Sequence, residues 1–206
     1  MFNPLPYQEI NALYSADNIL ESHVRAAISE AKLKNDEAKG CINKLLQEAS
    51  EEEINHGWVE HASRAAREAA DLARIHAVLL TAIHIEGAVN AFGVYVTGED
   101  FFKSHIERCS LESKLALTIA LLGKGCIQKK HPAFLAFRDL FERRNQIAHR
   151  KTKEWHPDSS DHIRVAKSNS DLDACSKAMD TFRELLLEVD QNAAFMAGVH
   201  KEEETL

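Results

Sequence analysis

The chain contains no proline between Pro6 and Pro132, and this feature restricts the fold more than any other. Proline removes a backbone donor and breaks helices, so its absence over such a length allows long uninterrupted helices. Apolar residues recur at helical spacing through most of the chain, and no useful stretch alternates as a strand does. The sequence therefore predicts an all-α fold, an up-and-down helical bundle.

Apolar periodicity and capping residues place the individual helices. They are predicted over residues 15–48, 50–72, 74–96, 110–122 and 132–149, with a last helix starting near Asp171. The polar segment 151–170 is predicted as a loop of roughly 20 residues, longer than compact connections usually need. We expect residues 1–70 to form a helical extension packed on a bundle of residues 71–198, followed by a flexible tail, 199–206.

Cysteine and histidine usage bounds the chemistry. The four cysteines lie far apart and form no CxxC pair, which argues against both a disulfide framework and a thiolate metal site. The pair of histidines in HGWVEH, residues 56–61, has one residue too many for a zinc helix. We expect no metal and no cofactor.

The N-terminus does not resemble a secretory signal, and the most apolar run, AVLLTAIHI, is short and interrupted by Thr81 and His84. We therefore expect a cytoplasmic protein that does not enter a membrane.

Positive charge is concentrated in one part of an acidic chain. The formal net charge is -7, yet residues 124–153 hold nine Lys or Arg and two acids, a local +7 that leaves -14 for the remainder. A local basic patch can bind a phosphate backbone even on an acidic protein. Alternatively, these charges cover a solvated helix face, which is common in soluble helical proteins.

An arginine interrupts the apolar stripe of FRDLFERRNQIAHRKTK, residues 137–153. On a helical wheel of about 100° per residue, five apolar residues lie within roughly 60° of Arg144: Phe137, Leu140, Phe141, Ile147 and Ala148. An unpaired guanidinium in a bundle core costs several kcal/mol, so Arg144 needs an anion. That anion is either an acid from another helix, Glu86 being one candidate, or a ligand in a groove between helices or subunits.

His149 follows Arg144 by five residues and lies about 140° from it on a regular helix. Asn145 and His149 are i and i+4 neighbours, so the amide can orient the imidazole. Arginine offers forked donors to phosphate and histidine titrates near neutrality, a combination suited to phosphoryl chemistry.

The stretch RNQIAH, Arg144 to His149, resembles the R-x4-H motif of the HEPN superfamily (higher eukaryotes and prokaryotes nucleotide-binding). The setting also fits, since the motif ends an amphipathic helix, has a basic end, and is followed by a polar loop and one more amphipathic helix. IEGAVNAFGVYVTGEDFF and SLESKLAL are similar to preceding helices in some members. The resemblance covers roughly residues 75–195.

This resemblance implies a helical bundle that dimerises so that two R-x4-H motifs meet in one cleft. Many members are metal-independent endoribonucleases of toxin-antitoxin or phage-defence systems. Carried over, Arg144 would bind the scissile phosphate, His149 would transfer protons during attack by the 2′-hydroxyl, and Asn145 would position phosphate or imidazole. Flanking phosphates of the RNA would be held by four further basic residues: Arg143, Arg150, Lys151 and Lys153.

Two alternatives stay open from the sequence. Some members of the superfamily only bind a nucleotide or a protein, so the second hypothesis is a non-catalytic HEPN-like module. The third is a helical scaffold in which Arg144 pairs with an internal acid. By analogy alone, an antitoxin of nucleotidyltransferase type is a further candidate partner.

Overall fold

The computed structural model describes residues 7–55, 57–148 and 161–189, with side chains described from residue 20 onwards except at 53, 55 and 161–168. Throughout these ranges the regular secondary structure is helical, which confirms the all-α prediction. In chain order the elements are α1 (Tyr7–Glu48), α2 (Glu51–Asn55), α3 (Trp58–Ala62), α4 (Arg64–Thr97), α5 (Glu99–Phe101), the π-helix η1 (Phe102–Ile106), α6 (Leu111–Leu121), α7 (Pro132–Ala148) and α8 (Asp161–Val189).

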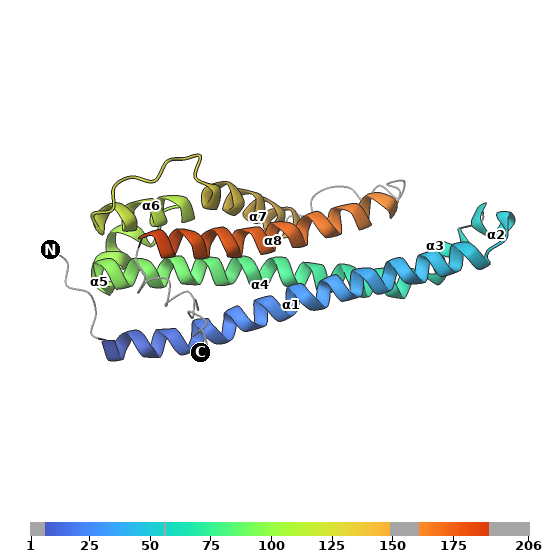
Figure 1. The fold of residues 1–206 in the computed structure, drawn as a ribbon, viewed down its shortest axis with the longest axis horizontal. Helices are drawn as coiled ribbons and strands as arrows, with labels where there is room; N and C mark the ends of the chain where they lie inside the picture. Colours follow the sequence, from blue (N-terminus) through green and yellow to red (C-terminus); the bar gives the residue numbers. More distant parts are fainter. Residues whose placement is uncertain (1–6, 56, 149–160, 190–206) are drawn as a thin grey trace, which may run out of the picture.

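The two longest helices, α1 and α4, run antiparallel, and the short helices α2 and α3 lie at the turn between them (Figure 1). The side of α1 that packs into the bundle carries Val24, Ala27, Ile28 and Ala31, all buried and spaced at i, i+3, i+4 and i+7. Two of these four are alanines, whose small side chains allow close packing. This narrow apolar side is enough to attach α1 to the bundle.

Helix α4 is the centre of the bundle, because α1, α6, α7 and α8 all pack against it. Val78, Ile85, Val89 and Phe92 are almost completely buried along it. By length and composition α4 could cross a membrane, but 56% of its most apolar window is buried inside the protein. Core helices of soluble proteins pass the same test of length and composition, so the test alone does not make α4 a membrane span.

Helices α7 and α8 pack on each other and on α4. Phe137 of α7 meets Phe182 of α8 nearly edge-on, with ring centroids 5.6 Å apart. Leu140, Leu185 and Leu186 are fully buried beside them. These residues belong to one core cluster with the buried stripe of α1.

The boundary expected near residue 70 falls inside a helix. Helix α4 continues through this position from Arg64 to Thr97, and neither glycine nor proline occurs between Arg64 and Gly87 to end it. Val24 of α1 shares its core with Leu140 of α7 and Leu185 of α8. Helix α1 therefore packs on α4 and α8 and contributes side chains to the shared core. The tail 199–206 lies outside the described residues.

The predicted loop 151–170 is wrong over its second half, because α8 begins at Asp161. The residues just before position 171 are polar and have low helix propensity, which made a loop the natural prediction. Tertiary contacts favour the helix instead: Asn169 accepts a hydrogen bond from the Asn35 side chain of α1. Residues 149–160 lie outside the described part of the chain.

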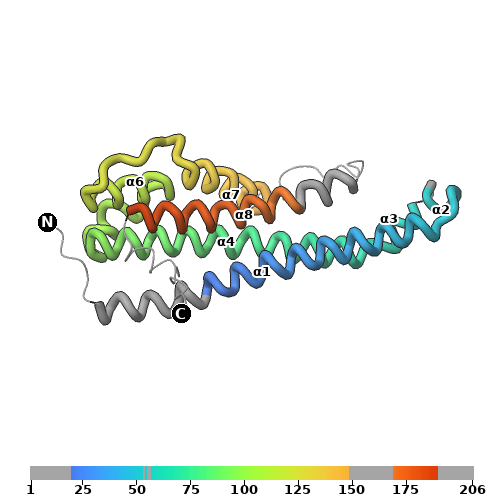
Figure 2. Tube along the Cα trace, viewed as in Figure 1, coloured from blue at the N-terminus to red at the C-terminus, as the bar shows by residue number. Residues whose placement is uncertain are grey.

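The predicted helix 74–96 ends within one residue of the end of α4, where Gly98 with a φ of 81° follows Thr97. The chain returns through α5 and η1, and Phe102 packs directly against Gly93 of α4. Helix α6 then begins as predicted, with Ser110 as N-cap accepting a hydrogen bond from the Ser113 backbone at 3.3 Å. Figure 2 shows the connection between α6 and α7 arching outward at one end of the bundle.

Candidate functional site

The last two turns of α7 are less buried than the rest of the helix. Its buried residues end at Leu140, and from there to Ala148 only Phe141, Arg143 and Ile147 are even half-buried. A single helical wheel gives the direction of each side chain but not how far neighbouring helices extend along it. Arg144 is on the apolar face of the wheel, but it lies in these less buried last turns. Its charge therefore does not have to be buried in the core.

Arg144 is exposed at this end of α7. Its Nη1 donates to Oδ1 of the adjacent Asn145 at 3.0 Å, and Asn145 is exposed as well. The ion pair with Glu86 does not form, and Glu86 is exposed on α4. Both predicted site residues in the described part of the motif therefore face solvent.

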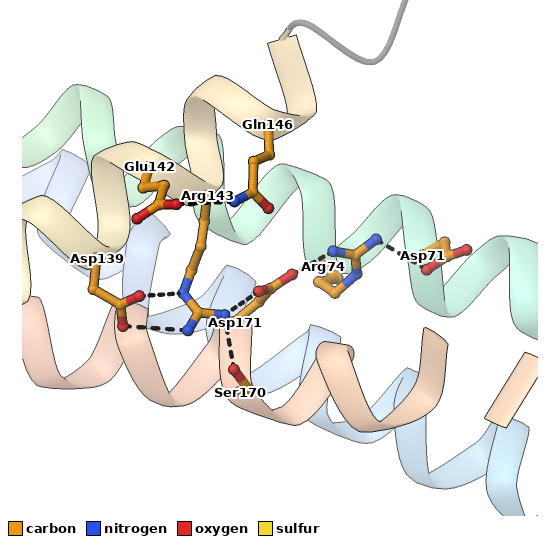
Figure 3. A network of polar contacts seen from close by, with 8 residues as sticks. All are labelled: Asp71, Arg74, Asp139, Glu142, Arg143, Gln146, Ser170 and Asp171. Atoms are coloured by element: carbon orange, nitrogen blue, oxygen red, sulfur yellow. Dashed lines mark hydrogen bonds and ion pairs between the residues drawn. The ribbon is translucent and has the colours of Figure 1, made fainter. Parts of the chain in front are cut away.

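Arg143 differs sharply from its neighbour. Its Nε and Nη2 donate to Oδ1 and Oδ2 of Asp139 at 3.0 and 3.3 Å. Its Nη1 donates to Ser170 Oγ at 2.8 Å and to Oδ1 of Asp171 (Figure 3). Partial burial acts to lower the pKa of the Arg143 guanidinium, but the two carboxylates outweigh it and raise the pKa.

Asp171 joins Arg143 to the interior of the bundle. Its second oxygen, Oδ2, accepts from Nη1 of Arg74, a residue of α4 that is only 4% exposed. Arg74 also donates to Asp71 Oδ1 at 3.1 Å. We call this group, which consists of Asp71, Arg74, Asp139, Arg143, Ser170 and Asp171, the Asp171 network; it links α4, α7 and α8.

The third arginine of α7 is also occupied. Arg138 donates through Nε and Nη2 to both oxygens of Glu112 on α6, each at 2.6 Å. Two of the three α7 arginines therefore have bidentate carboxylate partners. Among the residues that the structure describes, Arg144 forms no ion pair with an acid.

The described basic residues between 124 and 144 do not form one surface. Lys124, Lys129 and Lys130 are exposed on the arch before α7, whereas Arg144 is near the other end of that helix. Arg144 is twelve residues after Pro132 in α7, which at about 1.5 Å each places it roughly 18 Å along the helix from the arch. The remaining predicted site residues, His149, Arg150, Lys151 and Lys153, lie outside the described part of the chain.

Two buried groups elsewhere have shifted pKa values. Burial lowers the pKa of His84, partly opposed by the carboxylate of Glu21 on α1. Burial likewise raises the pKa of the Cys175 thiol to about 11, against the effect of a hydrogen bond with Thr81. Neither lies at the end of α7. The described residues contain no group of three His, Cys, Asp or Glu side chains arranged to hold a metal ion.

Sequence reasoning missed the Asp171 network. One signal was available, because Arg74 interrupts the buried stripe of α4 that includes Ala70, Ala77 and Val78. An arginine in a buried apolar stripe needs an anion, and this requirement applies to the buried Arg74 rather than to the exposed Arg144. Its partner could not be named, because Asp171 is 97 positions away in the chain.

Comparison with known proteins gave no matching family model, no matching curated protein and no matching solved structure. The site therefore has to be interpreted from its own residues.

Proposed function

We propose that this protein is a metal-independent endoribonuclease of HEPN type, acting as a homodimer in toxin-antitoxin or phage-defence systems. Arg144 and His149 are its catalytic residues, and Asn145 positions the phosphate or the imidazole. The observation that carries the proposal is the state of Arg144, whose charge is exposed and without an acidic partner in the described residues. An arginine in that state can offer forked donors to a phosphate.

The contrast with neighbouring arginines supports this assignment. Arg138 and Arg143 already donate to carboxylates, so binding a phosphate would require each to leave its partner. Arg144 only has to exchange a neutral amide contact with Asn145 for an anion. Its place beyond the buried part of α7 also leaves it accessible to a second subunit.

In the proposed reaction the 2′-oxygen of a ribose attacks the adjacent phosphorus. A bond from phosphorus to the 2′-oxygen forms, the bond to the 5′-oxygen breaks, and a 2′,3′-cyclic phosphate results. The 2′-hydroxyl loses its proton, the departing 5′-oxygen gains one, and His149 serves in this proton transfer. Arg144 stabilises the charge that builds on the phosphate oxygens.

The test is incubation of the purified protein with mixed RNA in EDTA. We expect cleavage by the wild type, products ending in 2′,3′-cyclic phosphate, and losses of at least about a hundredfold in Arg144→Ala and His149→Ala. Arg138→Ala is the matched control, since it removes an arginine from the same helix outside the motif.

Cleavage that is equal in all four proteins, or absent in the wild type, contradicts the nuclease proposal. RNA or nucleotide binding that depends on Arg144 but occurs without cleavage would support the non-catalytic HEPN-like module instead.

A further inference from the structure

The end of α7 that carries Arg144 has less apolar attachment than the rest of the helix. After Leu140 no side chain of this helix is buried, and the half-buried Phe141 and Ile147 pack against the core cluster. Helix ends with few buried contacts open readily. A phosphate-binding arginine, however, acts well only if the backbone that carries it is held in place. A polar contact adds to these two apolar ones in holding the last two turns.

Arg143 supplies that contact. Its guanidinium reaches from α7 to α8, where Nη1 donates to Ser170 Oγ at 2.8 Å and to Asp171. The remaining donors are held by Asp139, one turn earlier on the same helix. Arg143 is the residue immediately before Arg144, so fixing it fixes the turn from which Arg144 extends.

Asp171 is itself held from the core side. It is 8% exposed, and its other oxygen accepts from the buried Arg74, which Asp71 supports in turn. Figure 3 shows this sequence of contacts running from α4 through Asp171 to Arg143. The contacts that hold the end of α7 therefore extend to Arg74 on the central helix α4.

We propose that Asp171 is a positioning residue for Arg144: through Arg143 it fixes the last two turns of α7 in the orientation that phosphate binding requires. This inference rests on the proposed ribonuclease function. It also assigns Arg143 a different role from RNA contact, because its donors are committed to Asp139, Ser170 and Asp171.

For Asp171→Asn, the positioning role and simple electrostatics predict opposite changes in RNA affinity. Asp171→Asn removes a negative charge near the site, so Coulomb attraction alone would strengthen binding of RNA. If Asp171 positions Arg144, the same change weakens binding. Because Asp171→Asn also disturbs the buried Arg74, Arg143→Gln is the second variant, and it leaves the Arg74–Asp171 contact in place.

The first measurement is amide hydrogen exchange over residues 141–148 of the full-length protein. We expect exchange to become roughly tenfold faster in Arg143→Gln and Asp171→Asn, the size of effect that losing a charge-assisted hydrogen bond produces. Glu112→Gln is the matched control, since it weakens the other arginine-carboxylate pair of α7 and should leave these amides unchanged. Unchanged exchange in Arg143→Gln overturns the anchoring role.

The second measurement is binding of a single-stranded RNA oligonucleotide across a range of salt concentrations. Each phosphate contact contributes about 0.7 to the slope of log affinity against log salt for a single strand. We expect Arg144→Ala to reduce the slope, and Arg143→Gln and Asp171→Asn to weaken binding with the slope unchanged. A slope reduced in Arg143→Gln, with tighter binding by Asp171→Asn, would make Arg143 a direct contact and overturn the inference.

The two experiments separate the failure of this inference from the failure of the proposed function. A wild type that neither binds nor cleaves RNA contradicts the ribonuclease, while faster exchange in the variants would still establish the anchor. If the wild type binds RNA but binds it no more tightly than Arg143→Gln and Asp171→Asn, the positioning role of Asp171 is contradicted and the ribonuclease proposal is not.

Discussion

Arg74 and Asp171 form a buried ion pair between the central helix α4 and the last helix α8, and the same carboxylate also holds Arg143 of α7. Burying charged groups costs free energy that is recovered only when every partner is in place. The pair therefore makes the packing of three helices depend on one aspartate.

Asp171→Ala should lower the free energy of unfolding by about 3 kcal/mol, because it leaves the buried Arg74 with Asp71 alone. Urea denaturation at neutral pH measures the change. Glu112→Ala, which removes the partner of the half-exposed Arg138, serves as control and should have a much smaller effect. Equal losses in both variants would show that burial of the pair does not matter.

Gly93→Ala should destabilise the protein by roughly 1–3 kcal/mol. A Cβ at this position would lie 2.3 Å from Cε2 of Phe102, a ring that is itself buried. Gly87→Ala on the same helix meets nothing within 4 Å and should be neutral or stabilising by up to about 1 kcal/mol. Thermal unfolding of the two variants checks this, and a more stable Gly93→Ala would exclude the close packing of η1 on α4.

Stability should fall as the pH drops below about 6.5, partly through His84. Burial holds the pKa of this imidazole below the value of 6.5 that it takes when unfolded. The unfolded chain therefore binds a proton first, and the contribution of neutral His84 is complete above the unfolded pKa and lost as the pH falls toward the folded pKa.

Unfolding free energies of the wild type and of His84→Gln between pH 5 and 7.5 measure this contribution. We expect the variant to have the shallower dependence, by at most about 1.4 kcal/mol per pH unit. Identical slopes would mean that His84 does not titrate differently in the two states.

Cys175 should resist alkylation while the protein is folded. With a pKa raised by burial to about 11, roughly one thiol in a thousand is ionised at pH 8, and only the thiolate reacts. Exposed Cys126 is the internal comparison. Brief treatment with iodoacetamide followed by peptide mass spectrometry should show modified Cys126 and unmodified Cys175, with both modified in denaturant. Equal labelling in the folded protein would contradict the burial of Cys175.

Local signals predicted helix ends well where the responsible residues are neighbours in the chain. Ser110 marks the start of α6 and Pro132 the start of α7, as expected from capping and from proline in a first turn. A helical wheel could not show that Arg144 is exposed, because burial depends on how the neighbouring helices pack along α7, and that information is distributed over the whole chain.

Contacts between distant segments were beyond sequence reasoning for a related cause. Asn169 was predicted at the end of a polar loop and Asp171 at the start of the last helix, whereas both lie inside α8, where their partners Asn35 and Arg74 hold them at the edge of the core. Each of these polar contacts joins one pair of side chains, so it leaves no periodic pattern in the sequence like the one that identifies an apolar helix face.

The continuity of α4 also limits how this protein can be shortened. A chain starting at residue 71 would begin only three residues before Arg74, so the root of the Asp171 network would sit in a fraying first turn. It would also lack α1 and leave part of the apolar surface of α4 open to water, which invites aggregation. Biochemical work on Arg144 should therefore use the full-length chain.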